Sequence, residues 1–140
     1  MRKLPYLLSA LGAALTAMVC ALTVGKKKYA DVQELAIESQ KKGNELKAQF
    51  VDVIDRDTEA FNAVSAVFAM PKDTDEEKAA RKAAMQEALK GCTKTPFEMM
   101  ELACQALELT RSVVGKLNAS AASDLGCAAL SLKAAIQGAW

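Results

Sequence analysis

An apolar segment near the N-terminus constrains the fold of this chain more than any other feature. The eighteen residues from Leu7 to Val24 carry no charge, and basic residues flank them at Arg2, Lys3 and Lys26–Lys28. Such a segment has to be buried, either in a bilayer, as part of a signal peptide, or in a protein core. Five of the eighteen residues are alanine, so transfer into lipid is only mildly favourable. The segment alone leaves a membrane or secretion role and a core helix equally open.

The rest of the chain has the periodicity of helices. Residues 29–68 form one long periodic stretch, which Pro71 ends. No run of residues alternates with the period of two that is typical of a strand. The sequence therefore predicts an all-α fold, a bundle-like arrangement of about five helices, one of them long. A single domain over residues 1–140 is expected.

Capping signals divide the second half of the chain into three predicted helices. Thr74–Glu77 has the capping-box pattern and opens a helix that Gly91 is expected to end. Thr95–Glu98 repeats the signal, with a proline at the first helical position. Ser123 and Asp124 are expected to cap the last helix. The three predicted helices span about residues 75–90, 96–114 and 124–140.

Charge and composition exclude several classes of function. The chain has 18 basic and 17 acidic residues with the signs interspersed, which argues against a nucleic-acid-binding surface. It has no histidine, and histidine is both the commonest general base and the commonest metal ligand. The four cysteines form no Cys-x-x-Cys pair, so no zinc site is expected, and free thiols are the favoured interpretation. Acid–base chemistry would therefore fall to Asp, Glu, Lys, Tyr or Cys.

Asp57 is the most informative single residue. At about 100° per residue on a helical wheel, Asp57 lies near the middle of an otherwise apolar arc. A carboxylate in that position loses hydration and has to find a partner or take up a proton, and either condition suits a general acid or base. A structural carboxylate that pairs with a lysine or caps a neighbouring helix is the alternative, and the residues alone slightly favour it. The arc consists of Phe50, Val53, Ile54, Phe61, Val64 and Phe68.

Two further groups of polar residues have both a structural and a functional interpretation. The basic turn Gly25–Tyr29 is first of all a solvated turn after an apolar helix, and that interpretation is favoured. Its functional alternative is a binding cluster for a carboxylate-rich ligand. Asp124 is expected first as a capping or first-turn residue, and second as another carboxylate presented to a site.

Several blocks, in the same order along the chain, resemble one family. The segment Gly12–Leu15, continued through Met18 to Leu22–Tyr29, is similar to the first helix and following turn of the formiminotetrahydrofolate cyclodeaminase / methenyltetrahydrofolate cyclohydrolase family. Asp55–Val64 resembles the central D-x-D-x-x-A-F-x-A segment of that family. Shorter matches follow at Pro71–Lys72, Glu76–Lys78, Gln86–Leu89, Pro96 and Ser123–Asp124.

This resemblance implies a fold, a compartment and a reaction class. The family's apolar first helix belongs to a soluble, all-helical domain, so a core helix replaces the membrane interpretation. The expected protein is a cytoplasmic homodimer with neither a nucleic-acid nor a membrane partner. One branch of the family closes 5-formiminotetrahydrofolate to 5,10-methenyltetrahydrofolate with loss of ammonia. Another hydrolyses the methenyl form to 10-formyltetrahydrofolate. The tetrahydrofolate derivative, polyglutamylated or not, is the substrate, and neither a metal nor a redox cofactor is implied.

The resemblance also assigns roles to individual residues. Asp57 matches the second Asp of the D-x-D segment and is the expected catalytic acid–base. Lys26 and Lys27 match the basic pair after the first helix and are expected to hold the carboxylate tail of folate or to position the one-carbon group. Asp124 matches the Ser-Asp motif and is expected to orient the pterin or a catalytic water. The weaker candidates for hydrogen bonding around the site are Tyr29 and Asn62.

Two departures from the family pattern lead to alternatives. The family usually has a Gly-rich segment before its first helix, whereas residues 1–8 contain no glycine. The family also continues past the last helix, whereas the sequence stops at Trp140. We therefore expect a domain truncated at both ends. The alternatives are an inactive folate-binding remnant and a membrane-anchored helical scaffold that uses residues 7–24. Both folate reactions remain open.

Overall fold

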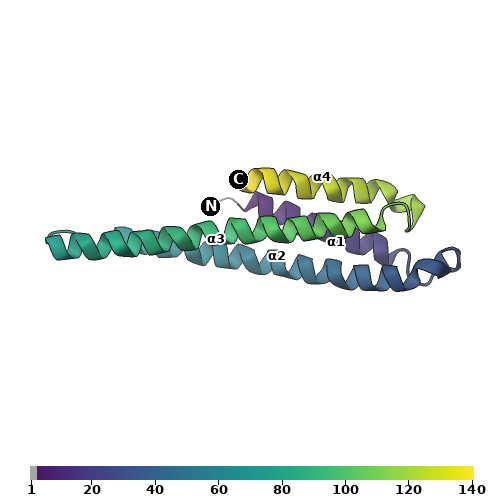
Figure 1. The fold of residues 1–140 in the computed structure, drawn as a ribbon, viewed down its shortest axis with the longest axis horizontal. Coiled ribbons are helices and arrows are strands. Elements are labelled where there is room, and N and C mark those ends of the chain that lie inside the picture. The colour runs from purple at the N-terminus through teal and green to yellow at the C-terminus, as the bar shows by residue number, and fades with distance from the viewer. Residues whose placement is uncertain (1–2) are drawn as a thin grey trace.

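The computed structural model describes residues 3–140, and in that range it contains helices and no strands (Figure 1). This confirms the predicted all-α class. Two short 3₁₀ helices, η1 and η2, lie in the turns that precede α2 and α4. The elements are α1 (Leu4–Ala21), η1 (Lys27–Val32), α2 (Gln33–Phe68), α3 (Asp75–Val113), η2 (Ala119–Ala121) and α4 (Ala122–Ala139).

The four α-helices form an up-down-up-down bundle. Helix α1 packs on α2 and α4, and α3 packs on the same two helices from the other side. Helices α2 and α3 have 36 and 39 residues, whereas α1 and α4 have 18 each. The α2–α3 hairpin therefore continues well past the bundle (Figure 1). The first turn of α1 and the last turn of α4 lie at the step where the bundle stops and the hairpin continues on its own (Figure 1).

Helix α3 corrects one prediction. It runs unbroken through Gly91 and Pro96, so the two helices predicted over residues 75–90 and 96–114 are one. The predicted helix end at Gly91 was wrong, and the described residues hold four α-helices instead of about five. An interior glycine costs a helix about 1 kcal/mol and an interior proline about 3 kcal/mol. Packing of α3 against α2 outweighs both local penalties.

The predicted helix starts have different outcomes. The capping box at Thr74 is confirmed, because its side chain accepts a hydrogen bond from the Glu77 amide and the Glu77 carboxylate accepts one from the Thr74 amide. The cap predicted at Ser123 was wrong, because α4 begins at Ala122, one residue before Ser123, and has no side-chain cap. Asp124 lies in the first turn of α4, where the helix dipole favours a negative charge.

Helix α1 is a core helix of the bundle. By length and composition it could cross a membrane, but half of it is buried inside the protein. Gly12 is in such close contact with α4 that an added Cβ would lie 2.5 Å from Cγ of Leu132. Gly43 of α2 also lies close to α1, since an added Cβ would lie 3.0 Å from Cβ of Ala17. These close contacts bury one face of the apolar segment.

Candidate functional site

A cavity of about 210 Å³ lies at the step between bundle and hairpin. All four helices contribute to it: the first turn of α1, the last turn of α4 and the middle of α2 and α3. Its walls are mainly apolar, with Pro5, Phe61 and Ala139 among the lining residues. Among the described residues, Asp57 is the one carboxylate in this lining. We refer to this space below as the Asp57 cavity.

Two hydroxyl groups hold the carboxylate of Asp57 on one side. The phenol of Tyr6 on α1 donates to Oδ1 at 3.0 Å, and Oγ1 of Thr95 on α3 donates to the same oxygen at 2.8 Å. Within residues 3–140 no donor bonds to Oδ2. The partner that a carboxylate in an apolar arc requires is therefore a pair of hydroxyls from two other helices, and the second oxygen stays available to a water or a ligand.

Tyr6 is a permanent donor in this arrangement. Its side chain is 4% exposed, and burial together with the adjacent Asp57 carboxylate raises the pKa of Tyr6 to about 12. The phenol therefore keeps its proton across the physiological range. Nothing in the sequence pattern identified Tyr6, because its partner is 51 residues away along the chain.

Thr95 directs its hydroxyl across the helix interface. Five other Ser and Thr side chains in the helices and their ends donate to the carbonyl four residues earlier, which is the usual local bond. Thr95, which the sequence predicted to be a helix cap, lies inside α3 and bonds to α2 instead. The five with the local bond are Thr16, Thr23, Thr58, Ser65 and Thr110.

An ion pair fixes the register of α2 and α3 beside the cavity. The two terminal nitrogens of the Arg56 guanidinium donate to the two carboxylate oxygens of Glu98, at 2.7 and 2.8 Å. Arg56 also contacts Asp52 at 2.8 Å. The Arg56 guanidinium holds the pKa of Glu98 below its usual range. Arg56 precedes Asp57 on α2, and Glu98 follows Thr95 by three residues on α3. The Arg56–Glu98 ion pair therefore positions the two helices at the site.

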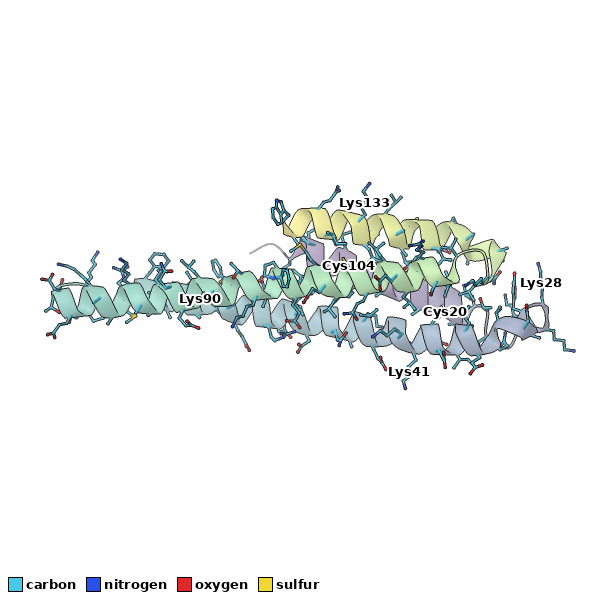
Figure 2. The ribbon with its side chains drawn as sticks, viewed as in Figure 1. Cys20, Lys28, Lys41, Lys90, Cys104 and Lys133 are labelled. Atoms are coloured by element: carbon cyan, nitrogen blue, oxygen red, sulfur yellow. The ribbon has the colours of Figure 1, made fainter. Side chains whose placement is uncertain are left out.

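The predicted residues of the basic turn lie at the opposite end of the bundle. Lys26 and Lys27 are exposed in the turn before α2. The half-buried Tyr29 accepts a hydrogen bond from the Ala119 amide at 3.1 Å, which ties this turn to the segment before α4. Figure 2 shows their neighbour Lys28 at the end of the molecule that is farthest from the hairpin tip.

A single side chain organises this basic turn. The Oε1 atom of Gln33 accepts from the Gly25 amide at 2.7 Å, and its Nε2 atom donates to the carbonyls of Thr23 and Tyr29. Gly25 has a φ of +77°, which a residue with a side chain rarely adopts. No pattern in the sequence identified Gln33. Gln33 therefore links several backbone groups of the turn, whose lysine side chains stay exposed.

The structure thus separates the predicted site residues into two groups. Asp124 and Gly138 are 14 residues apart on α4, which is about 21 Å at 1.5 Å per residue, and Gly138 lines the Asp57 cavity. Asp124 lies with Lys26, Lys27 and Tyr29 at the far end from Asp57. Asn62 is exposed on α2 and does not line the cavity, because five residues after Asp57 it faces another direction.

Two other cavities lack the hydroxyl-held carboxylate. One of about 720 Å³ lies between α3 and α4, with Glu108 and Arg111 as its charged lining residues. Another, of about 390 Å³ near the hairpin tip, is lined by basic side chains such as Lys72 and Arg81. Within residues 3–140, no three Asp, Glu or Cys side chains converge as a metal-ligand set.

Comparisons with known proteins agree with this architecture. Residues 7–140 match the family model of formiminotransferase-cyclodeaminase. The chain is 42% identical over 130 residues to a methenyltetrahydrofolate cyclohydrolase of Methylorubrum extorquens, covering 93% of this chain and 62% of that protein. It is 30% identical over 132 residues to the formimidoyltransferase-cyclodeaminase of Rattus norvegicus, covering 94% of this chain and 24% of that one.

A solved structure has the same fold. The formiminotetrahydrofolate cyclodeaminase of Thermotoga maritima superposes with a TM-score of 0.82 at 24% identity, covering 98% of this chain and 64% of that one. The chain therefore spans less than two thirds of the length of these relatives.

Proposed function

Because this chain belongs to the formiminotransferase-cyclodeaminase family, we propose that it is a one-carbon folate enzyme whose reaction takes place in the Asp57 cavity. The observation that carries the proposal is the carboxylate of Asp57 in the lining of the cavity: two hydroxyl donors hold one of its oxygens, and no donor within residues 3–140 bonds to the other. The higher identity to the cyclohydrolase relative favours hydrolysis of 5,10-methenyltetrahydrofolate.

The free oxygen of Asp57 suits a proton-transfer role. In the methenyl substrate a single carbon bridges N5 and N10 of the reduced folate, and water adds to that carbon. Oδ2 of Asp57 accepts a proton from the attacking water and returns a proton to N5 as the carbon–N5 bond breaks. The second proton of the water leaves to solvent, which balances the positive charge of the methenyl group. The product is 10-formyltetrahydrofolate.

Tyr6 and Thr95 support this step without touching the reacting atoms. Their hydroxyls bond to Oδ1 only, so they restrict the rotation of the carboxylate and leave Oδ2 to the substrate. Mainly apolar walls limit the water around the reacting carbon, which strengthens each electrostatic contact there. A preorganised carboxylate of this kind avoids reorienting at the moment of proton transfer.

Closure of 5-formiminotetrahydrofolate is the second candidate. It is favoured by the similarity to the formimidoyltransferase-cyclodeaminase of Rattus norvegicus and to the formiminotetrahydrofolate cyclodeaminase of Thermotoga maritima. In that reaction N10 attacks the formimino carbon and ammonia leaves, so a proton has to reach the departing nitrogen. The same Asp57 carboxyl group would deliver it.

The residues at the opposite end of the bundle are proposed to bind a distant part of the substrate. Lys26 and Lys27 would bind the distal carboxylates of a polyglutamylated substrate, because they are too far from Asp57 to contact the one-carbon unit. Tyr29 keeps their turn in place through its bond to Ala119. Asp124 is a candidate only for a site shared between two copies of the chain. Nothing supports a role for Asn62 at the cavity.

We further propose a soluble, cytoplasmic homodimer. The support is an exposed apolar stripe along α1 whose spacing of three, four, seven and four residues is typical of a helix–helix seam. Replacing Leu7 and Leu11 with lysine should then lower the mass measured by light scattering from that of a dimer to that of a monomer. A wild-type chain that is monomeric at micromolar concentration would contradict the dimer. The stripe consists of Leu4, Leu7, Leu11, Met18 and Leu22.

The absorbance of the methenyl group tests the reaction directly. Accelerated loss of that absorbance from 5,10-methenyltetrahydrofolate indicates the cyclohydrolase, and its appearance from 5-formiminotetrahydrofolate indicates the cyclodeaminase. Asp57→Asn should lower turnover by about 100-fold or more, the usual contribution of a general acid or base. Asp55→Asn is the matched control, because Asp55 is an exposed carboxylate two residues away. Normal turnover in Asp57→Asn would refute the assignment.

A further inference from the structure

Pro96 leaves one backbone carbonyl of α3 without its helical donor. A proline nitrogen carries no hydrogen, so the carbonyl oxygen of Cys92, four residues earlier, lacks the amide donor that a helix normally supplies to it. The hydroxyls nearest to it in sequence are engaged elsewhere: Thr93 donates to the Lys90 carbonyl and Thr95 donates to Asp57. No side chain within residues 3–140 replaces the missing donor.

The residue that carries this carbonyl lines the Asp57 cavity. Cys92 and Pro96 both line the cavity and are one helical turn apart, on the same face of α3. Helix carbonyls point along the axis towards the C-terminus, so the oxygen of Cys92 lies between these two lining residues. Proline is the least favourable residue in a helix interior, and here it occupies the position that exposes an acceptor beside the proposed reaction site.

We propose that the Cys92 carbonyl is a substrate-binding acceptor, and that it accepts a hydrogen bond from an N–H group of the reduced pterin ring. This rests on the proposed folate function. Asp57 Oδ2 faces the one-carbon unit, and the carbonyl provides a second polar contact in a cavity whose walls are otherwise mainly apolar. A neutral acceptor suits a ring N–H better than a second carboxylate would, because it binds the donor without competing for its proton.

Restoring the missing donor tests this role. Pro96→Val supplies a backbone N–H to the Cys92 carbonyl and keeps an apolar side chain of similar size in the cavity wall. Pro96→Ala supplies the same N–H with less apolar bulk. In both variants we expect the Kd for tetrahydrofolate and the KM for 5,10-methenyltetrahydrofolate to rise about three- to tenfold, the value of one hydrogen bond. We expect kcat to stay within about twofold.

Stability should change in the opposite direction. Replacing an interior proline gives α3 a further hydrogen bond, so the Tm of both variants should rise by about 5 °C or more. A variant that is more stable and yet binds less tightly cannot be explained by damage to the fold. Gly91→Ala is the matched control: it also stabilises α3, it has open space around the added Cβ, and it should leave the Kd unchanged.

The outcomes separate this inference from the proposed function. If the wild type binds tetrahydrofolate and Pro96→Val binds it equally tightly, the carbonyl has no role and the inference is overturned. If Gly91→Ala weakens binding as much as Pro96→Val, rigidity of α3 is responsible, and the inference is again overturned. If the wild type neither binds tetrahydrofolate nor converts either folate, the proposed function fails and the pterin contact fails with it.

Discussion

Removing the two hydroxyls that hold Asp57 tests whether they position the carboxylate for catalysis. Tyr6→Phe keeps the buried ring and deletes the donor at 3.0 Å, and Thr95→Val deletes the donor at 2.8 Å with little change in volume. A hydrogen bond to a charged group contributes about 1.5–3 kcal/mol. Since the remaining hydroxyl still bonds to Oδ1 in each single variant, we expect each to lose about 1–2 kcal/mol of unfolding free energy.

The effect on catalysis should exceed the effect on binding. With one donor lost, the carboxylate samples other rotations, and a loss of about 1.4 kcal/mol of transition-state stabilisation corresponds to a tenfold fall in kcat. In the double variant Asp57 has no partner, so its kcat should approach that of Asp57→Asn while KM stays within about threefold. Thr95→Ser keeps the hydroxyl and should retain most of the wild-type kcat.

The assay is the change in methenyl absorbance under conditions where circular dichroism shows each variant to be folded, together with urea unfolding of the same samples. If the folded double variant has a kcat within twofold of wild type, Tyr6 and Thr95 are structural groups only. The reasoning would also fail if Thr95→Ser lost as much turnover as Thr95→Val.

Three further predictions follow from single features of the structure. The pKa of Tyr6 is raised to about 12 from 10.0, so the phenol ionises at a lower pH in the unfolded chain than in the folded one. About 3 kcal/mol of unfolding free energy that is present below pH 10 should therefore be lost between pH 10 and 12. Urea unfolding at pH 9 and at pH 11.5 should show this loss in the wild type and a much smaller loss in Tyr6→Phe. Gly12→Ala should destabilise the fold by about 1–3 kcal/mol in thermal unfolding, because its Cβ would overlap Leu132. Neutralising Lys26 and Lys27 together should raise the Kd for a polyglutamylated folate more than it lowers kcat, and it should remove the salt dependence of that Kd. An unchanged affinity at low salt would show that both lysines only solvate the turn.

The sequence predicted the local features of the site and missed the non-local ones. The helical wheel placed Asp57 in an apolar arc and showed that it needed a partner, because both properties depend on residues within a few turns of one helix. It could not identify Tyr6 or Thr95, because these partners are 51 and 38 residues away and meet Asp57 only through helix packing.

The capping signal at Thr95 shows a related limit. A Thr-Pro pair followed by an acidic residue favours a helix start when judged alone. In the folded chain the same residues lie inside α3, because α2 provides a partner surface along its whole length. Because of this packing, Thr95 is an interior residue whose hydroxyl bonds to Asp57 instead of a helix cap. Pro96 is likewise an interior residue, and it leaves the Cys92 carbonyl without its usual donor. Both features follow from a Thr-Pro capping signal that the packing of α3 on α2 overrides.

The family resemblance predicted a single site from residues that lie at opposite ends of the bundle. Matching motifs in sequence order assigned Asp57, Lys26 and Asp124 to one site, but motif order contains no information on distance along a helix. In a bundle of antiparallel helices, residues at the two ends of α4 are separated by its full length. A long substrate or a second copy of the chain is needed to connect the two groups.

Helix α1 explains why hydropathy alone left two interpretations of the N-terminal segment. A helix that is apolar all round has to be buried on every side, and the bundle buries only the face of α1 that includes Gly12 and Ala17. The opposite face leaves Leu7 and Leu11 about half exposed. The first turn of the same helix holds Tyr6 against Asp57 on the buried side. In the proposed dimer, one helix would therefore supply the seam with its exposed face and the donor to Asp57 with its buried face.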